Sequence, residues 1–191
     1  MSVEKYHDSL DTFLNALSAK DATILELACG PGNITKYLLA QNPELQILAT
    51  DLSPSMVKLA KENNPQISVQ IMDCRSLLDL ESTFQAIVCG FGLPYLSKEE
   101  SIQLIKDASQ SLMSHGLLYL STMEDDYSKS GFKPSSTDPN EGLIMYFHEA
   151  KYLTEAMKKN GFEIVELSRV NYLDNIGEDV TDLIIIGKLI S

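Results

Sequence analysis

Short apolar runs alternate with amphipathic stretches along almost the whole chain, and this alternation limits its fold more than any other feature does. Thr23 to Leu27 is one such run, and it is typical of a buried strand because it is short, mostly apolar and followed by a Gly/Pro cluster. In the segment before it, from Val3 to Leu17, apolar residues recur at steps of three and four, as on one face of a helix. Strands that alternate with helices at this pitch form a parallel sheet with helices on both faces.

The same patterns predict the other elements. We expect further strands at 45–50, 67–72, 84–89, 116–122, 162–170 and 182–189, further helices at 33–41, 54–64, 97–113 and 148–160, and a short helix at 76–80. The last two strands are antiparallel neighbours, because the stretch between them, 173–178, is too short for a crossover helix. We therefore predict one α/β domain over residues 1–191, a three-layer sandwich around a seven-stranded, mostly parallel sheet with an antiparallel last strand.

The charge balance argues against two classes of partner. The chain carries 15 Lys and Arg residues against 27 Asp and Glu residues, a formal net charge of −12. A uniformly acidic protein repels the phosphate backbone of nucleic acids and anionic lipid head groups. No apolar run approaches the roughly 20 residues that a membrane-spanning helix needs, and the first 20 residues carry acids, unlike a signal or transit peptide. We expect neither nucleic acid nor a membrane as a partner.

Neither the cysteines nor the acidic residues form a pattern typical of a metal or disulfide site. Cys29, Cys74 and Cys89 are odd in number and too widely spaced for a disulfide framework or a zinc site, which favours a reducing cytoplasm. The acidic run at 124–126 is better explained as a solvated turn, since adjacent side chains do not all converge on one ion. We expect no metal.

The most informative segment lies between the first strand and the following helix, and it reads Glu26-Leu27-Ala28-Cys29-Gly30-Pro31-Gly32-Asn33. This is the place where α/β folds bind nucleotides, at the carboxyl ends of the strands. Gly30 and Gly32 let the backbone turn tightly and approach a ligand without a Cβ in the way. The alternative is that the glycines serve only the bend.

Two carboxylates follow at informative distances. Asp51 comes after the second strand, about 20 residues beyond the glycine loop, a spacing that places a carboxylate over the ribose of an adenine nucleoside. Alternatively, Asp51 is only an acidic residue near the start of the helix that follows Ser53. Asp73, with Cys74, ends the third strand, where a carboxylate can accept a hydrogen bond from the exocyclic amine of adenine. The alternative is that Asp73 is a turn residue, as Asp after a strand often is.

The loop favours a cofactor without phosphates. A nicotinamide fingerprint needs a third glycine where this chain has Thr35, and Pro31 removes an N–H donor that a pyrophosphate would use. The chain also lacks the Gly-Lys-Ser/Thr of a P-loop. We therefore predict an adenosine cofactor that carries no phosphate.

These motifs resemble those of the class I S-adenosylmethionine-dependent methyltransferases, a Rossmann-like family, over nearly the whole chain. The resemblance implies the strand order 3-2-1-4-5-7-6, with the seventh strand antiparallel. It also implies that S-adenosyl-L-methionine is the cofactor. The implied cofactor residues are Glu26, Ala28, Gly30, Gly32, Asp51, Leu52, Met56, Asp73, Cys74, Gly90 and Phe91. Ala28 departs from the family, which often has glycine at that position.

The resemblance also bears on the acceptor of the methyl group. After the fourth strand the chain reads Cys89-Gly90-Phe91-Gly92-Leu93-Pro94-Tyr95, without the Asn/Asp-Pro-Pro-Tyr/Phe of enzymes that methylate base amines or glutamine. We expect a small-molecule acceptor, methylated at O, N or C. Residues 1–20, as a leading helix, and 124–147 are expected to form a lid and the substrate pocket.

The sequence leaves several alternatives open. A non-catalytic cofactor-binding partner or regulatory protein with the same fold, or a nicotinamide-dependent oxidoreductase, would share much of this pattern. No catalytic residue is assigned, and the oligomeric state is unknown. His148 is a candidate base, against the simpler role of a residue at the start of a helix.

Overall fold

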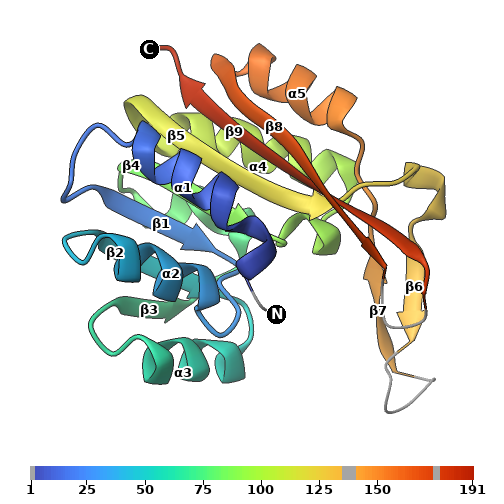
Figure 1. The fold of residues 1–191 in the computed structure, drawn as a ribbon, viewed down its shortest axis with the longest axis horizontal. Helices are drawn as coiled ribbons and strands as arrows, with labels where there is room; N and C mark the ends of the chain where they lie inside the picture. Colours follow the sequence, from blue (N-terminus) through green and yellow to red (C-terminus); the bar gives the residue numbers. More distant parts are fainter. Residues whose placement is uncertain (1–2, 135–140, 174–176) are drawn as a thin grey trace.

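A seven-stranded sheet forms the centre of the computed structural model, which describes residues 3–134, 141–173 and 177–191 (Figure 1). The strand order is β3-β2-β1-β4-β5-β9-β8. The strands are β1 (Thr23–Leu27), β2 (Gln46–Asp51), β3 (Ser68–Ile71), β4 (Phe84–Gly90), β5 (Leu112–Met123), β8 (Phe162–Leu173) and β9 (Asp179–Leu189). Only β9 is reversed, because it pairs antiparallel with both β5 and β8. The predicted fold class, strand order and reversed last strand are confirmed.

Helices cover both faces of the sheet. On one face lie η1 (Glu4–Tyr6), α1 (His7–Ala16), α2 (Asn33–Gln41) and α3 (Pro54–Asn63), and on the other lie η2 (Cys74–Leu80), α4 (Lys98–Ser111) and α5 (Ala150–Lys159). Because side chains alternate along a strand, Ile24 packs into the first layer and Leu25 into the second. The result is two apolar cores, one on each side of the sheet.

The starts of α3 and α4 show how local sequence sets helix boundaries. Ser97 accepts a hydrogen bond from the Glu100 backbone N–H at 3.2 Å, and the Glu100 carboxylate accepts one from the Ser97 N–H at 2.7 Å, which is the predicted capping box. Ser53 occupies the predicted N-cap of α3, but its side chain makes no capping bond. Its hydroxyl lies 2.8 Å from that of Ser55 instead.

The segment 124–140 differs from the irregular loop that its composition predicts. Tyr127–Lys129 forms the short helix η4, and Gly131–Pro134 (β6) pairs antiparallel with Gly142–Met145 (β7) in a hairpin that projects from the sheet (Figure 1). Gly142 makes this pairing possible, since a Cβ there would lie 2.2 Å from the Lys133 carbonyl oxygen. Residues 135–140 lie outside the described residues, as do 174–176 of the predicted last turn.

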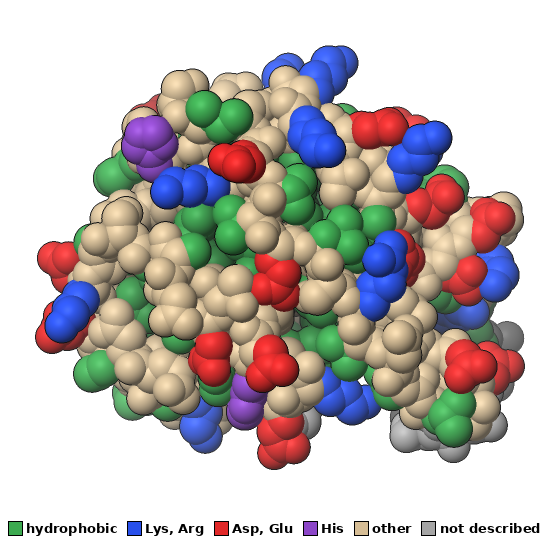
Figure 2. Space-filling view, turned by 45° about the horizontal axis from the view of Figure 1, so that its top comes forward, with side chains coloured by type: hydrophobic (Ala, Val, Ile, Leu, Met, Phe, Trp, Pro, Cys, Tyr) green, Lys and Arg blue, Asp and Glu red, His purple; other side chains and the backbone are tan. Residues whose placement is uncertain are grey.

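The surface carries charges of both signs. On the face shown in Figure 2, basic side chains are scattered among acidic ones. Among the described residues, no helix is both long and apolar enough to cross a bilayer.

Candidate cofactor and substrate site

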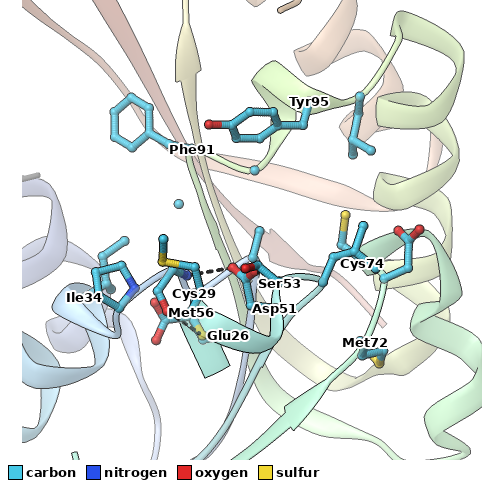
Figure 3. A pocket seen from close by; sticks show the side chains of 18 of the residues that line it. Glu26, Cys29, Ile34, Asp51, Ser53, Met56, Met72, Cys74, Phe91 and Tyr95 are labelled. Atoms are coloured by element: carbon cyan, nitrogen blue, oxygen red, sulfur yellow. Dashed lines mark hydrogen bonds between the residues drawn. The ribbon is translucent and has the colours of Figure 1, made fainter. Parts of the chain in front are cut away.

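A cavity of about 730 Å³ opens at the carboxyl ends of β1, β2 and β4 (Figure 3). Its size lies within the range of small-molecule sites, roughly 300–1,000 Å³. Most of the residues that the sequence predicts for the cofactor line it. These are Glu26, Ala28, Gly30, Asp51, Leu52, Met56, Asp73, Cys74, Gly90 and Phe91.

The loop between β1 and α2 is built from left-handed backbone. Ala28, Gly30 and Gly32 have φ values of +50°, +53° and +78°. Ala28 therefore adopts a conformation that costs a residue with a Cβ about 1 kcal/mol. The loop is held to β2 by the Cys29 N–H, which donates to the Thr50 carbonyl at 2.9 Å. A Cβ at Gly30 would meet no atom within 4 Å.

Gly32 has a different environment, because it does not line the cavity. A Cβ at this position would lie 2.5 Å from Nδ2 of Asn64 and 3.4 Å from Ala60. Asn64, which follows α3, donates from the same Nδ2 to the Gly32 carbonyl at 3.0 Å. The structure thus gives Gly32 a packing role where the loop meets the end of α3.

Asp51 joins the glycine loop to the start of α3. Its Oδ2 accepts a hydrogen bond from the Gly30 N–H at 2.8 Å, and its Oδ1 accepts one from the Ser53 N–H at 2.8 Å. Each carboxylate oxygen can accept a further hydrogen bond. Asp51 therefore fixes the loop while its oxygens remain able to accept donors from a ligand in the cavity.

Glu26 lies at the floor of the cavity and is only 1% exposed. The Thr35 hydroxyl donates a hydrogen bond to its Oε2. Burial raises the pKa of Glu26 to about 7, and the negative charge of Asp51 acts in the same direction. Near neutral pH, both the protonated and the charged forms of Glu26 are populated.

Asp73 is held by an ion pair. Arg75 donates from Nε to both Asp73 oxygens, at 2.9 and 3.0 Å, and from Nη2 to Oδ2 at 2.6 Å. The hydrogen bond from Arg75 holds the pKa of Asp73 below its usual value. The remaining arm of Arg75 reaches Glu100 at 3.0 Å. Among the described residues that line the cavity, Arg75 is the one cationic side chain, and both of its partners are acids.

His148 lies outside this cavity. It is fully buried, its Nε2 lies 2.8 Å from the Leu93 carbonyl oxygen, and its Nδ1 contacts the Tyr152 hydroxyl. Because a carbonyl can only accept, Nε2 carries the proton of the neutral ring. Burial lowers the pKa of His148 and favours this neutral form. The structure places His148 as a support for η3 (Leu93–Tyr95) and gives it no contact with the cavity.

The acidic run at 124–126 has separate partners for each carboxylate. Glu124 pairs with Arg169, Asp125 pairs with Lys129 at 2.8 Å, and Asp126 accepts the Ser128 N–H at 2.8 Å. Each of these contacts is local or lies at the surface, so each carboxylate of the run has a partner within the protein.

Sequence reasoning did not assign Tyr95 and Leu96, at and after η3, to the site, although both line the cavity. Leu143 and Ile144 of β7 and Val3 also line it, and they lie within the segments 124–147 and 1–20 that the sequence predicts for the lid and substrate pocket. The β7 residues come from the hairpin, whose strands are too short to give a clear alternation.

Comparisons with known proteins find methyltransferases. Residues 24–116 match the model of a methyltransferase domain family. The chain is 27% identical over 168 residues to a tRNA N(3)-methylcytidine methyltransferase of Schizosaccharomyces pombe, covering 78% of this chain and 67% of that protein. It is 35% identical over 74 residues to a trans-aconitate 2-methyltransferase of Methylobacterium nodulans, covering 39% of this chain and 29% of that protein.

Solved structures share the fold at low identity. A S-adenosylmethionine-dependent methyltransferase of Methanosarcina mazei superimposes with a TM-score of 0.78 at 16% identity, covering 93% of this chain and 96% of that one. The magnesium protoporphyrin IX methyltransferase of Synechocystis, solved with S-adenosylmethionine bound, gives 0.71 at 15% identity, covering 97% and 80%.

Proposed function

We propose that this chain belongs to the class I S-adenosylmethionine-dependent methyltransferase family and that it transfers a methyl group from S-adenosylmethionine to a small-molecule acceptor. One observation carries the proposal. Asp51 sits at the cavity between the glycine loop and α3, and it binds the loop backbone through Gly30. The residues predicted at the ends of β1, β2, β3 and β4, apart from Gly32, line the same cavity.

The charge of the cavity supports this cofactor over a dinucleotide. Glu26, Asp51 and Asp73 line it, and the cation Arg75 is already bound to Asp73 and Glu100. S-adenosylmethionine carries two positive groups, a sulfonium and an ammonium, and one negative carboxylate, so an acidic lining attracts it. A nicotinamide dinucleotide would place two negatively charged phosphates near the same carboxylates, which would repel them.

Six residues that line the cavity have proposed roles in holding the cofactor. Asp51 would accept the ribose hydroxyls, Asp73 and Cys74 would hold adenine, and Met56 would pack against the nucleoside. Gly90 and Phe91 would border the methyl donor. When bound, the cofactor supplies an electrophilic methyl group on a cationic sulfur. The protein's task is to align the acceptor and to exclude water, because the departing thioether needs no proton.

The acceptor is proposed to be a small molecule and not a nucleic acid, although one relative is named as a tRNA methyltransferase. The net charge of −12 opposes a polyanion. The leading segment and residues 124–147 would form the lid and the acceptor side, and free thiols at Cys29, Cys74 and Cys89 fit a reducing cytoplasm. The second candidate is a cofactor-binding protein without catalysis.

Calorimetry with S-adenosylhomocysteine tests the proposal. We expect binding, and we expect Asp51→Ala to weaken it about 10- to 100-fold through loss of charge-assisted hydrogen bonds. Asp126→Ala is a matched control, since that carboxylate also accepts a backbone N–H but lies outside the cavity. Absence of binding at millimolar ligand overturns the proposal. A metabolite extract incubated with methyl-labelled cofactor then separates enzyme from binder, because only an enzyme labels an acceptor.

A further inference from the structure

One wall of the cavity is almost entirely apolar. Figure 3 shows Phe91 and Tyr95 across the cavity from Asp51 and Met56. Leu96, Leu143 and Ile144 line the cavity as well. None of these five wall side chains, at 91, 95, 96, 143 and 144, carries a charge. We call these five residues the apolar wall.

A backbone hydrogen bond joins the two parts of the apolar wall, η3 and β7. The Tyr146 N–H, just after β7, donates to the Pro94 carbonyl of η3 at 2.8 Å. The His148 side chain donates a hydrogen bond from Nε2 to the carbonyl of the neighbouring Leu93. The hairpin is therefore joined to η3 by one main-chain hydrogen bond, which does not depend on a ligand.

The apolar wall leaves large side chains exposed at the cavity. Tyr95, Leu143 and Ile144 are 53%, 60% and 54% exposed. Phe132 of β6, 56% exposed, lies directly opposite Ile144 in the hairpin register and extends the same face. Single exposed apolar residues are ordinary, but a group of them beside a cavity marks a binding surface.

The cavity offers no cation to an anionic acceptor among the residues that the structure describes. Arg75 is bound by Asp73 and Glu100. Lys133, opposite Leu143 in the hairpin register, lines a neighbouring cavity instead and lies over the Phe147 ring at 5.7 Å. A carboxylate buried against apolar side chains without a counter-ion carries a large desolvation cost.

From this juxtaposition we propose that the acceptor site is the apolar wall and that it takes an uncharged, apolar small molecule. The proposal rests on the proposed function and narrows its acceptor. It excludes tricarboxylates such as trans-aconitate as acceptors for this chain.

Two probes of equal ring size test the acceptor class, namely 2-naphthol, which is uncharged at pH 7, and the anion 2-naphthoate. Their binding is measured by calorimetry in the presence of saturating S-adenosylhomocysteine, with trans-aconitate as a third ligand. We expect 2-naphthol to bind at least about tenfold more tightly than either anion. Ile144→Asp should weaken 2-naphthol about tenfold or more, and Ile144→Lys should reverse the preference toward 2-naphthoate.

The controls separate this proposal from the previous one. Ile190→Asp changes an equally exposed side chain near the C-terminus, outside the cavity, and should leave all three affinities unchanged. S-adenosylhomocysteine affinity should stay within about twofold in the Ile144 variants, since Ile144 is not among the residues predicted to hold the cofactor. If S-adenosylhomocysteine does not bind, both proposals fall. If it binds but 2-naphthoate or trans-aconitate binds as well as 2-naphthol, or Ile144→Asp has no effect on 2-naphthol, only the acceptor class is overturned.

Discussion

The hydroxyl of Tyr6 donates a buried hydrogen bond of 2.7 Å to Oδ2 of Asp182, a residue 176 positions away in the chain. Tyr6 also packs against Phe91, with ring centroids 5.2 Å apart, and its N–H donates to the carbonyl of Val3. Both Phe91 and Val3 line the cavity. The Tyr6–Asp182 pair therefore ties the leading segment to β9 and fixes one edge of the site.

Removing the Tyr6 hydroxyl tests the strength of this tie. Tyr6→Phe deprives a fully buried carboxylate of a donor, and we expect the free energy of unfolding to fall by about 1–3 kcal/mol in urea denaturation. Tyr37→Phe is the matched control, because Tyr37 donates to Asp11 at 2.6 Å on the exposed surface. There we expect a loss of about 0.5 kcal/mol or less. Equal losses in the two variants would mean that burial adds nothing to the Tyr6–Asp182 bond.

Much of the sheet could be predicted because each strand has a local signature. Ile24 and Leu25 lie in a short apolar run, and 173–178 is too short for a crossover. The Tyr6–Asp182 bond has no such signature, since neither residue's neighbours encode a partner 176 positions away. The β6–β7 hairpin was not predicted, because its strands have only four residues each. Leu143 and Ile144 are also exposed, so no buried face imposes an alternating pattern on the sequence.

The site was predictable where chemistry and spacing coincide. Asp51 stands out by its distance from the glycine loop, and the structure brings the two within one hydrogen bond. The contact of Arg75 with Glu100 was not predicted, because it depends on how η2 packs against the start of α4. Gly32 shows the opposite case, in which a residue of the motif has a neighbour, Asn64, that explains it without a ligand.

Glu26 makes stability depend on pH. The folded protein holds the Glu26 proton with a pKa of about 7, above the unfolded value, so the stabilisation is complete at low pH and is lost as the pH rises from about 4.5 to 7. Glu26→Gln keeps an acceptor for Thr35 but cannot ionise. We expect the difference in unfolding free energy, variant minus natural protein, to increase by about 3 kcal/mol as the pH rises from 4 to 8.

Denaturation curves of both proteins across that pH range measure the difference. His148 contributes with the opposite sign, since its pKa is lowered, but it is common to both proteins and cancels. A difference that does not change with pH would show that Glu26 ionises normally despite its burial.

Arg75 controls the protonation of Asp73. We expect Arg75→Ala to raise the pKa of Asp73 part of the way toward its usual value, because the guanidinium bonds are lost while the N–H of residue 75 still donates to Asp73. Titration of the Asp73 carboxyl carbon by NMR measures the shift. Glu100→Gln leaves the Arg75–Asp73 pair in place and should leave this pKa low. Fold stability should change by about 1 kcal/mol or less, as for other exposed ion pairs. An unchanged Asp73 pKa in Arg75→Ala would assign the shift to the backbone donor alone.

Gly30 and Gly32 can be separated by the same substitution. Gly32→Ala places a Cβ 2.5 Å from Nδ2 of Asn64 at a φ of +78°, so we expect a loss of about 2 kcal/mol or more in stability. Gly30→Ala meets no neighbour within 4 Å at a φ of +53°, so it should cost about 1 kcal/mol. Because residue 30 lines the cavity and residue 32 does not, S-adenosylhomocysteine affinity should fall more in Gly30→Ala. Urea denaturation and calorimetry on both variants measure the two effects. If Gly32→Ala weakens S-adenosylhomocysteine more than Gly30→Ala does while the protein remains folded, then Gly32 contacts the cofactor as its motif predicts, and packing on Asn64 is not its main role.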